Sequence, residues 1–408
     1  MTWNPEIKQF IADHLQDDTA RLLFSAHRFP GVDVPFAVEQ IEARRRLKNK
    51  LPEWYGNPDL VMGGRIPAEQ CSSEQTARYK HSLVEGYHSL CDMTGGMGVD
   101  FWYMSRGMDE AIYSECQPHL CEAASHNFAA LSASSADARP VISVREGVST
   151  QMPVPDVDVI YLDPARRSDS GSRIYEIEDC VPNVIAWQDE LLSHCKRLIT
   201  KVSPMADVSR TLQRLRDVLA VHIVSVRNEC KELLIVQKGE QDTSLDPSAQ
   251  AVMFRCVDFL SKGMVSFSFC QSELSDSASV PIVSALSEMR YLYEPDVSLM
   301  KAQAYAPLVR KYPIQMVDAN THLFVSDQAI PDFPGRSFVI DQLIEFSSRQ
   351  LKQLKRQIPQ ANIATRNFVL SPEELRSRSG IREGGSVYLF GCQAHQIGAV
   401  LLSCHKLD

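Results

Sequence analysis

A regular switch between strand and helix periodicity over residues 88–238 constrains the fold of this chain more than any other feature. Short runs rich in β-branched and other apolar residues alternate there with stretches in which apolar residues recur at helical spacing. From this pattern we expect strands at residues 88–92, 111–115, 140–144, 157–163, 196–202, 219–227 and 231–237. Such alternation predicts an α/β fold with a parallel, doubly wound sheet.

The last two predicted strands must pair differently from the others. Only a few residues separate 219–227 from 231–237, which is too short for the crossover that a parallel pair requires. We therefore expect an antiparallel pair at the late edge of the sheet. This layout differs from that of an all-parallel dinucleotide-binding sheet.

Length, charge and cysteine usage narrow the class of protein. The 408 residues predict two or three domains, and the net charge of −9 argues against a wholly basic nucleic-acid binder while leaving room for a local basic patch. The 11 cysteines are scattered and form no CxxC pair, so we expect no metal site. Thiols used this freely indicate a reducing cytosol, and no apolar run reaches membrane-spanning length. We expect a cytoplasmic protein with no membrane partner.

The stretch Leu90–Gly98, with sequence LCDMTGGMG, is the most informative motif. An apolar strand ends there at Asp92, and a glycine-rich turn leads into a helix that begins near Val99. Glycines in such a turn permit positive φ and let a ligand approach the backbone, and the N–H groups at the helix start suit a polar ligand. Because the stretch does not fit G-x-G-x-x-G, a nicotinamide cofactor is disfavoured.

Acidic residues stand at the ends of four predicted strands: Asp92, Glu115, Glu146 (followed by Gly147) and Asp163. The carboxyl ends of parallel strands meet at one edge of a sheet, where open α/β sheets bind ligands. An acid at the position of Glu115 can take both ribose hydroxyls of a nucleoside cofactor. Any one of these acids alone could equally cap the following helix, but the set favours cofactor binding.

Two of these segments resemble a known family. Asp92–Gly98 is similar to the first motif of class I S-adenosylmethionine-dependent methyltransferases, and Asp163–Arg166 (DPAR) is similar to their fourth motif. Five other stretches resemble a Bacteroidetes group of these enzymes that carries C-terminal ferredoxin-like and THUMP-like domains: Glu69–Lys80, Asn228–Leu233, Tyr291–Pro295, Asp332–Arg336 and Arg366–Phe368. The resemblance covers nearly the whole chain. The catalytic domain is also loosely similar to guanine-N2 cap hypermethylases.

The resemblance implies a domain plan and a cofactor. The plan is an N-terminal helical region (1–85), a methyltransferase domain (86–240), a small ferredoxin-like domain (245–330) and a THUMP-like domain (331–408). The cofactor is S-adenosyl-L-methionine. Its implied binding residues are Asp92, Thr94, Gly95, Gly96, Gly98, Glu115, Glu146 and Asp163.

Within the two C-terminal domains, local patterns predict further elements. Residues 251–270 alternate as an antiparallel hairpin. We expect helices over 297–308 and 341–356 and after Ser371. Strands are expected at 314–317, 322–325, 338–340, 368–369, 387–391 and 398–405.

The implied chemistry is direct, in-line methyl transfer, with Asp163, Pro164 and Arg166 as catalytic residues. The Asp163 carboxylate and the Pro164 carbonyl would accept hydrogen bonds from an exocyclic amine and orient its lone pair. Arg166 stands where many relatives carry an aromatic base clamp, and its guanidinium could stack on a base or hold a phosphate. The acid expected after the third strand falls at Val148, so Glu146 would substitute for it. Carbon-5 methylation ranks lower because it needs a cysteine nucleophile where Ser203 stands.

Residues 340–382 carry eight basic and four acidic residues, a net charge of +4 on an acidic chain. Lys352, Lys355 and Arg356 share a helix face and, with Arg366, are the predicted RNA-binding residues. A solvated amphipathic helix would explain the same charges, and the run Arg44–Arg46 fits a solvated helix face better than a nucleic-acid contact. The THUMP-like resemblance favours structured RNA, tRNA or rRNA. Two alternatives remain: methylation of a small molecule or protein, or a non-catalytic RNA-binding protein with a degenerate methyltransferase domain.

Overall fold

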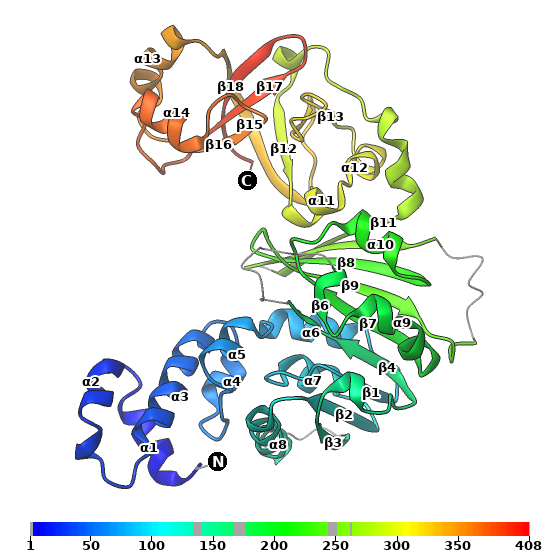
Figure 1. The fold of residues 1–408 in the computed structure, drawn as a ribbon. Helices are drawn as coiled ribbons and strands as arrows, with labels where there is room; N and C mark the ends of the chain where they lie inside the picture. The colour runs from blue at the N-terminus through cyan, green and yellow to red at the C-terminus, as the bar shows by residue number, and fades with distance from the viewer. Residues whose placement is uncertain (1–2, 134–139, 167–176, 244–250, 262, 408) are drawn as a thin grey trace. The chain divides into compact units, whose positions relative to one another are not determined.

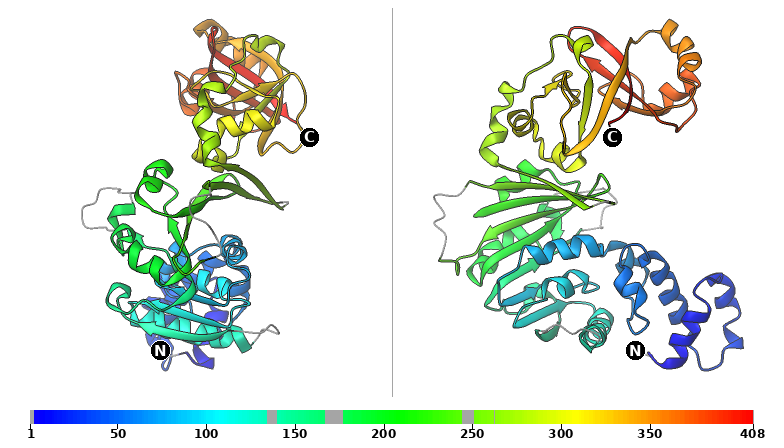
Figure 2. Two further views of the ribbon diagram at one scale, coloured as in Figure 1. Left: turned by 90° about the vertical axis from the view of Figure 1, so that its right-hand side faces the viewer. Right: turned by 180° about the vertical axis from the view of Figure 1, so that it is seen from behind.

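The computed structural model describes residues 3–133, 140–166, 177–243, 251–261 and 263–407. The chain forms two compact units, one made of residues 1–219 and 233–250 and the other of residues 220–232 and 251–408. Figures 1 and 2 show the course of the chain. Among the described residues, no helix has the length and apolar character needed to cross a membrane.

The first unit begins with helices, as predicted for residues 1–85. They are α1 (Pro5–Asp13), α2 (Thr19–Phe24), α3 (Val34–Leu47), α4 (Pro52–Gly56), α5 (Arg65–Gln70) and α6 (Glu74–Ser82). Side-chain caps start several of them: the Ser73 hydroxyl, for example, accepts the backbone N–H of Thr76 at the start of α6. Leu47 and Trp54 share one hydrophobic core with Phe101 and Tyr113 of the following domain. The N-terminal helices therefore pack directly on the domain that carries the glycine turn.

Two of the three arginines in α3 are structural, so their interpretation as a solvated helix face was wrong, whereas Arg46 is exposed, as predicted, and pairs with Glu69. Arg44 is buried, and it donates to the backbone carbonyls of Asn57, Pro58 and Leu60. Arg45 donates to the carbonyls of Leu15 and Asp17. Burial lowers the pKa of Arg44 to about 10. These guanidiniums tie α3 to the loops that follow α1 and α4 by donating to their backbone carbonyls.

The sheet of the first unit has the strand order β9-β7-β4-β1-β2-β3. The strands are β1 (Ser89–Asp92), β2 (Glu110–Glu115), β3 (Val141–Glu146), β4 (Val157–Leu162), β7 (Cys195–Val202) and β9 (Glu229–Lys238). The neighbours from β3 to β7 are parallel, and β9 is antiparallel to β7. The doubly wound sheet with a late antiparallel strand is thereby confirmed, but the pair of β8 (Val218–Val226) and β9 is not its edge, because two further strands extend the sheet beyond β8.

Helices fill the connections between these strands. They are α7 (Val99–Met104), α8 (Pro118–Ala133), α9 (Val184–Ser193) and α10 (Val208–Arg214). A small two-stranded sheet joins β5 (Ala165–Arg166), which follows the fourth strand, to β6 (Cys180–Val181). The boundary between the two units falls inside β8 (Val218–Val226) and β9. Arg227 and Asn228 form the tight turn between these strands, and both have positive φ, as a type I′ hairpin requires.

In the second unit, β8 pairs in parallel with β10 (Met253–Leu260), which pairs antiparallel with β11 (Gly263–Cys270). A seven-stranded sheet follows, in the order β13-β14-β12-β15-β18-β17-β16. Its strands are β12 (Tyr291–Pro295), β13 (Gln315–Met316), β14 (Phe324–Ser326), β15 (Gly335–Glu345), β16 (Asn362–Arg366), β17 (Val387–Ala394) and β18 (Gly398–Lys406). The helices are α11 (Val297–Ala302), α12 (Tyr305–Lys311), α13 (Ser348–Gln357) and α14 (Pro372–Ser379), and α13 packs beside α14 (Figure 1).

Three C-terminal predictions were wrong in detail. The helix expected over 297–308 is two helices, because Gln303 adopts a left-handed conformation between them. The helix expected from residue 341 begins only at Ser348, because β15 continues to Glu345 in register with β18. The strand expected at 368–369 is β16 at 362–366, and Asn367 has positive φ directly after it. The predicted hairpin over 251–270 is confirmed.

Candidate active site

The carboxyl group of Asp92 holds the glycine turn together. Asp92 ends β1 and is buried, and its Oδ1 accepts the backbone N–H of Thr94 at 2.9 Å and the Thr94 hydroxyl at 3.3 Å. Burial raises the pKa of Asp92 to about 8, although the hydrogen bonds from Thr94 oppose the shift. The Asp92 carboxyl group therefore fixes the shape of the glycine turn through its two hydrogen bonds with Thr94.

Thr94 links this turn to the predicted catalytic motif. Its hydroxyl oxygen accepts the backbone N–H of Asp163 at 2.6 Å. Asp163 directly follows β4, which is the neighbour of β1 in the sheet. One threonine thus joins the ends of two adjacent strands, and it brings Asp92, Thr94 and Asp163 to a single edge of the sheet.

The glycines of the turn differ in what surrounds them. A Cβ on Gly95 would lie 2.1 Å from the Tyr113 ring, and one on Gly98 would lie 2.7 Å from the Phe128 ring. These two positions are therefore glycine because aromatic side chains of the core pack against them. Gly96 has φ +55°, and a Cβ there would meet only the Thr94 carbonyl, at 3.8 Å. Gly96 is the glycine of the turn that leaves room for a ligand.

Glu115 points its carboxylate at the same turn. Its Oε2 accepts the N–H of Gly96 at 2.8 Å, and its Oε1 accepts the N–H of Gln117 at 2.9 Å. Glu146 is the direct neighbour of Glu115 across the parallel pair of β2 and β3, and it is exposed. The structure therefore gathers the predicted acids of β2 and β3 side by side, with Glu115 oriented on Gly96.

The raised pKa of Asp92 predicts a specific pH dependence for Asp92→Asn. The folded protein binds this proton more tightly than the unfolded chain, whose Asp titrates near pH ~4. Wild-type stability contributed by this group is therefore full at low pH and falls as the pH rises from ~4 to about 8. An asparagine keeps the acceptor for Thr94 and does not ionise. We expect urea unfolding to show the variant gaining stability relative to wild type across this window; a constant difference would contradict the assignment.

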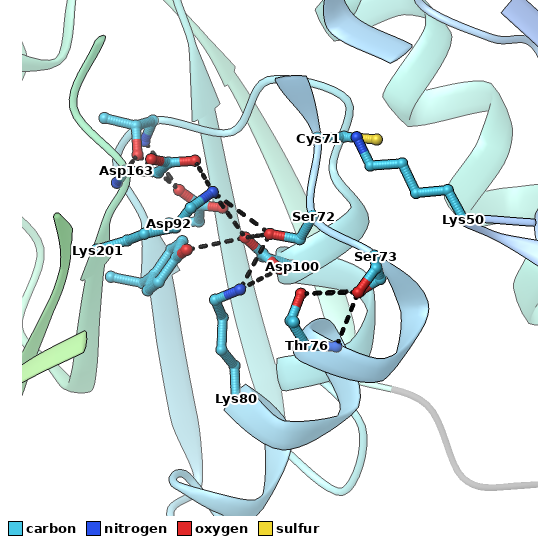
Figure 3. A network of polar contacts seen from close by, with 12 residues as sticks. Lys50, Cys71, Ser72, Ser73, Thr76, Lys80, Asp92, Asp100, Asp163 and Lys201 are labelled. Carbon is cyan, nitrogen blue, oxygen red and sulfur yellow. Dashed lines mark hydrogen bonds and ion pairs between the residues drawn. The ribbon is translucent and has the colours of Figure 1, made fainter. Parts of the chain in front are cut away.

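A buried network that sequence reasoning missed lies behind Asp163 (Figure 3). Lys80 of α6 donates to Asp100 Oδ1 at 3.1 Å and to Ser72 Oγ at 3.0 Å. The Ser72 and Tyr161 hydroxyls donate to Asp100 Oδ2 at 2.7 and 2.8 Å. Lys201 Nζ lies 2.6 Å from Asp163 Oδ2, 3.4 Å from Ser72 Oγ and 4.0 Å from Asp100 Oδ2.

The electrostatics of Asp100 follow from this environment. Burial alone would raise the pKa of the Asp100 carboxyl. Lys80, Lys201 and the two hydroxyl donors lower this pKa by more than burial raises it, so the net pKa lies below the usual range. Ser72 and Lys80 stand within Glu69–Lys80, one of the stretches that resemble the methyltransferase family. Asp100 follows the glycine turn by two residues, and Lys201 lies near the end of the fifth parallel strand. These positions, one just after the glycine turn and one near a strand end, are the only features of the sequence that could have indicated a role for Asp100 and Lys201.

The rest of the DPAR motif extends along β5. The Asp163 side chain is half-buried, with 39% of its surface exposed, and Pro164 follows it. The backbone of Arg166 pairs with Cys180 in the small sheet. The side chain of Arg166 lies outside the described residues.

The stretch Asn228–Leu233 has a structural role. The Asn228 side chain accepts the N–H of Val297 at the start of α11, and its backbone N–H donates to Asp258. Burial raises the pKa of the Cys230 thiol to about 11, so it is a protonated thiol at neutral pH. Neither feature is that of a nucleophile, which agrees with the low rank given to carbon-5 chemistry.

The predicted RNA-binding residues are divided between two places. Lys355 and Arg356 are exposed on α13, while the side chain of Lys352 lies outside the described residues. Arg366 of β16 instead pairs with Glu294 at 2.5 Å, and Glu294 also accepts Arg336 Nε at 2.6 Å. Three stretches noticed for their resemblance, Tyr291–Pro295, Asp332–Arg336 and Arg366–Phe368, thus meet at one ion-pair cluster.

The chain matches both models of domain families and solved structures of other proteins. A family model of ferredoxin-like domains matches residues 291–334, and a model of THUMP domain-like regions matches residues 335–406. The solved structure described as a "putative methyltransferase from Porphyromonas gingivalis W83" is 31% identical, covers 100% of both chains and has a TM-score of 0.87. A comparison with curated proteins found no match.

More distant structures cover only part of the chain. A predicted O-methyltransferase, protein Atu636 from Agrobacterium tumefaciens, is 15% identical over 45% of this chain and 86% of its own, with a TM-score of 0.31. Trm5b from Pyrococcus abyssi is 11% identical over 41% of this chain and 49% of its own, with a TM-score of 0.30. The full-length match carries the assignment: the chain belongs to the same family as the Porphyromonas protein, class I methyltransferases with C-terminal ferredoxin-like and THUMP-like domains.

Proposed function

We propose that the protein is an S-adenosylmethionine-dependent methyltransferase that methylates a base nitrogen of structured RNA, tRNA or rRNA, by direct in-line transfer. The observation that carries this proposal is the position of Asp163. Its carboxylate is partly exposed at the end of β4, and Thr94 ties its backbone to the glycine turn. An acceptor for an amine thus stands next to the turn where a nucleoside cofactor would bind.

The residues around the turn fit such a cofactor. Gly96 leaves open space on its side of the turn, and the Glu115 carboxylate beside it can accept the ribose hydroxyls. We assign Asp92, Thr94, Gly95 and Gly98 to shaping this site, Glu115 and Glu146 to its polar edge, and Gly96 to close approach. When bound, the cofactor supplies a methyl group on a positively charged sulfonium. The four-part domain plan remains a prediction alongside this assignment.

Asp163 and Pro164 would act on the acceptor base. An exocyclic amine donates its N–H groups to the Asp163 carboxylate and the Pro164 carbonyl, which turns the nitrogen lone pair toward the methyl group. Holding reactants in this geometry contributes much of the rate acceleration in such reactions. Arg166 would stack on the base or hold a phosphate.

The RNA substrate is supported by the C-terminal domain. Residues 335–406 match a THUMP domain-like model, and exposed Lys355 and Arg356 lie on α13 within that range. On an acidic protein, a local group of basic side chains such as these is the part of the surface that would attract a phosphate backbone. One observation favours the alternative of a small-molecule or protein substrate: the charge of Arg366 is already paired with Glu294.

Methyl-labelled cofactor distinguishes these substrate classes. Purified protein would be incubated with S-adenosylmethionine carrying a labelled methyl group and total RNA, protein or small-molecule fractions from a strain that lacks the gene. We expect label in nuclease-sensitive RNA, and none when the RNA comes from the parent strain, whose sites are already filled. Label only in the protein or small-molecule fraction would contradict the proposal.

The cofactor assignment predicts the effect of losing the Asp92 carboxyl. Asp92→Ala leaves the N–H and hydroxyl of Thr94 without their acceptor, so the turn should loosen, and S-adenosylhomocysteine should bind about tenfold or more weakly, a loss of roughly 1.4 kcal/mol or more. Asp92→Asn keeps the acceptor and serves as the matched control, with binding close to wild type. Calorimetry measures both. If NADH binds and S-adenosylhomocysteine does not, the cofactor class is wrong.

A further inference from the structure

The ion pair between Lys201 and Asp163 is the outermost link of an alternating row of charges. From inside to outside the row reads Lys80, Asp100, Lys201 and Asp163 (Figure 3). The exposed fraction of the side chains rises in the same order, from 0% through 9% and 14% to 39%. Two cations and two carboxylates thus run from the core to the candidate catalytic position.

Burying a row of charged side chains has an unfavourable desolvation free energy, so stability alone does not explain the row. Taking charges out of water is unfavourable, and replacing a buried ion pair by well-packed apolar side chains of similar size is often neutral or stabilising. Each charge here has hydrogen-bond partners: Ser72 and Tyr161 donate to Asp100, and Ser72 accepts from Lys80. A network satisfied in this way fixes the position of its members closely.

Asp163 is fixed at both of its ends. Its backbone N–H donates to Thr94, and its Oδ2 accepts from Lys201 at 2.6 Å. Among the described residues, no partner occupies Oδ1. The arrangement therefore leaves one carboxylate oxygen to accept an amine N–H, at a position set by the other oxygen.

We propose that Lys201 is a positioning residue that orients the Asp163 carboxylate, and that Asp100, anchored by Lys80 and Ser72, holds Lys201 in place. The proposal rests on the proposed function, because it gives the network its purpose in methyl transfer. It also assigns a second effect to Lys201. As a cation beside Asp163, it offsets the attraction of that carboxylate for a positively charged ligand.

The chain supplies a matched control on the same pair of strands. Lys196 of β7 pairs with Asp158 of β4 at 2.6 Å, and each residue lies five positions before its counterpart in the Lys201–Asp163 pair. The Lys196 side chain is 44% exposed, and its pair stands away from the turn, at the start of the strands. Lys196→Met thus removes an equivalent lysine–aspartate ion pair from the same strand without changing the partner of Asp163.

The first measurement is steady-state kinetics with labelled cofactor and total RNA from the deletion strain. Lys201→Met should lower kcat by about 10- to 100-fold with the KM for RNA unchanged, because a misplaced acceptor affects the transfer step. Lys201→Arg should recover part of the loss, and Lys196→Met should match wild type. Wild-type kinetics in Lys201→Met would overturn the proposal. A variant in which kcat, RNA affinity and melting temperature all fall together would also overturn it, because that result would indicate a structural role only.

The second measurement needs no turnover. Calorimetry would compare the affinities for S-adenosylmethionine, which carries the sulfonium charge, and S-adenosylhomocysteine, which does not. Lys201→Met should shift the affinity ratio toward S-adenosylmethionine by about three- to tenfold, and Lys196→Met should leave it unchanged. An unchanged ratio in Lys201→Met contradicts the proposal. If Lys201→Met does not fold, Lys201→Gln provides the same loss of charge.

The two hypotheses fail differently. A wild-type protein that transfers no methyl group to RNA contradicts the proposed function, and the binding ratio then decides the role of Lys201 alone. An active wild-type protein whose Lys201 variants behave like Lys196→Met contradicts only the positioning role.

Discussion

Replacing Asp163 with alanine is expected to lower turnover by about 100- to 1,000-fold while RNA affinity stays within about twofold of wild type. Under the proposed function, the variant loses the oxygen that would accept the amine N–H, a contact made at the reacting nitrogen. The residues that we assign to phosphate contacts, on α13, are unchanged in this variant. The loss should therefore appear in kcat, and the KM for RNA should change little.

Asp158→Ala is the matched control for this variant. Asp158 also pairs with a lysine of β7, but it stands at the other end of β4. It should lower stability slightly and leave turnover unchanged. Single-turnover kinetics with labelled cofactor separate transfer from product release. Equal transfer rates in the Asp163→Ala protein and wild type would remove Asp163 from the chemistry.

Neutralising the basic face of α13 is expected to have the second large effect. The variant Lys352→Ala, Lys355→Ala, Arg356→Ala removes three positive charges that we assign to phosphate contacts. RNA should bind about 10- to 100-fold more weakly at low salt, across sequences, and the log–log salt slope should be smaller by up to about three. Binding of S-adenosylhomocysteine should not change, because the residues that we assign to the cofactor site lie in the first compact unit, whereas α13 lies in the second.

A control with the same change in charge tests whether position matters. Arg21, Arg28 and Lys48 are exposed on the N-terminal region, and their replacement by alanine also removes three charges. Filter binding of tRNA and rRNA fragments over a salt series measures both triple variants. If the two lose affinity equally, net charge alone explains the effect. If the α13 variant keeps the wild-type slope, that helix is not the RNA contact; Arg44 and Arg45 cannot replace it, because their guanidiniums already bind backbone carbonyls.

The central sheet could be predicted from the sequence because its signal is local. Parallel strands are buried on both faces, so each appears as a short apolar run between turns, and the predicted strands overlap β1 to β4 and β7 to β9. The segment 341–356 is different. Its apolar residues recur at helical spacing, yet residues up to Glu345 belong to β15 because they pair with β18, more than fifty residues away. Strand pairing at that separation overrides a local helical pattern.

Some residues of the candidate site could be predicted from local sequence, and others depend on tertiary packing. The strand-end acids follow from the sheet itself, so Asp92, Glu115 and Asp163 could be placed at one edge before the structure was known. The partnership of Lys80, Asp100 and Lys201 depends on how α6 packs against α7 and on the position of Lys201 near the end of β7. A lysine in an amphipathic helix carries no local sign that it will be fully buried beside a carboxylate. The misassigned arginines of α3 have the same explanation, since their acceptors are carbonyls of distant loops.

The most direct test of the proposed function is mass spectrometry of nucleosides from tRNA and rRNA of a deletion strain and its parent. We predict that one methylated nucleoside disappears on deletion, returns with the wild-type gene, and does not return with the Asp163→Ala gene. The Asp158→Ala gene should restore it. An identical set of nucleosides in the deletion strain and the parent would contradict the assignment of this protein as an RNA methyltransferase.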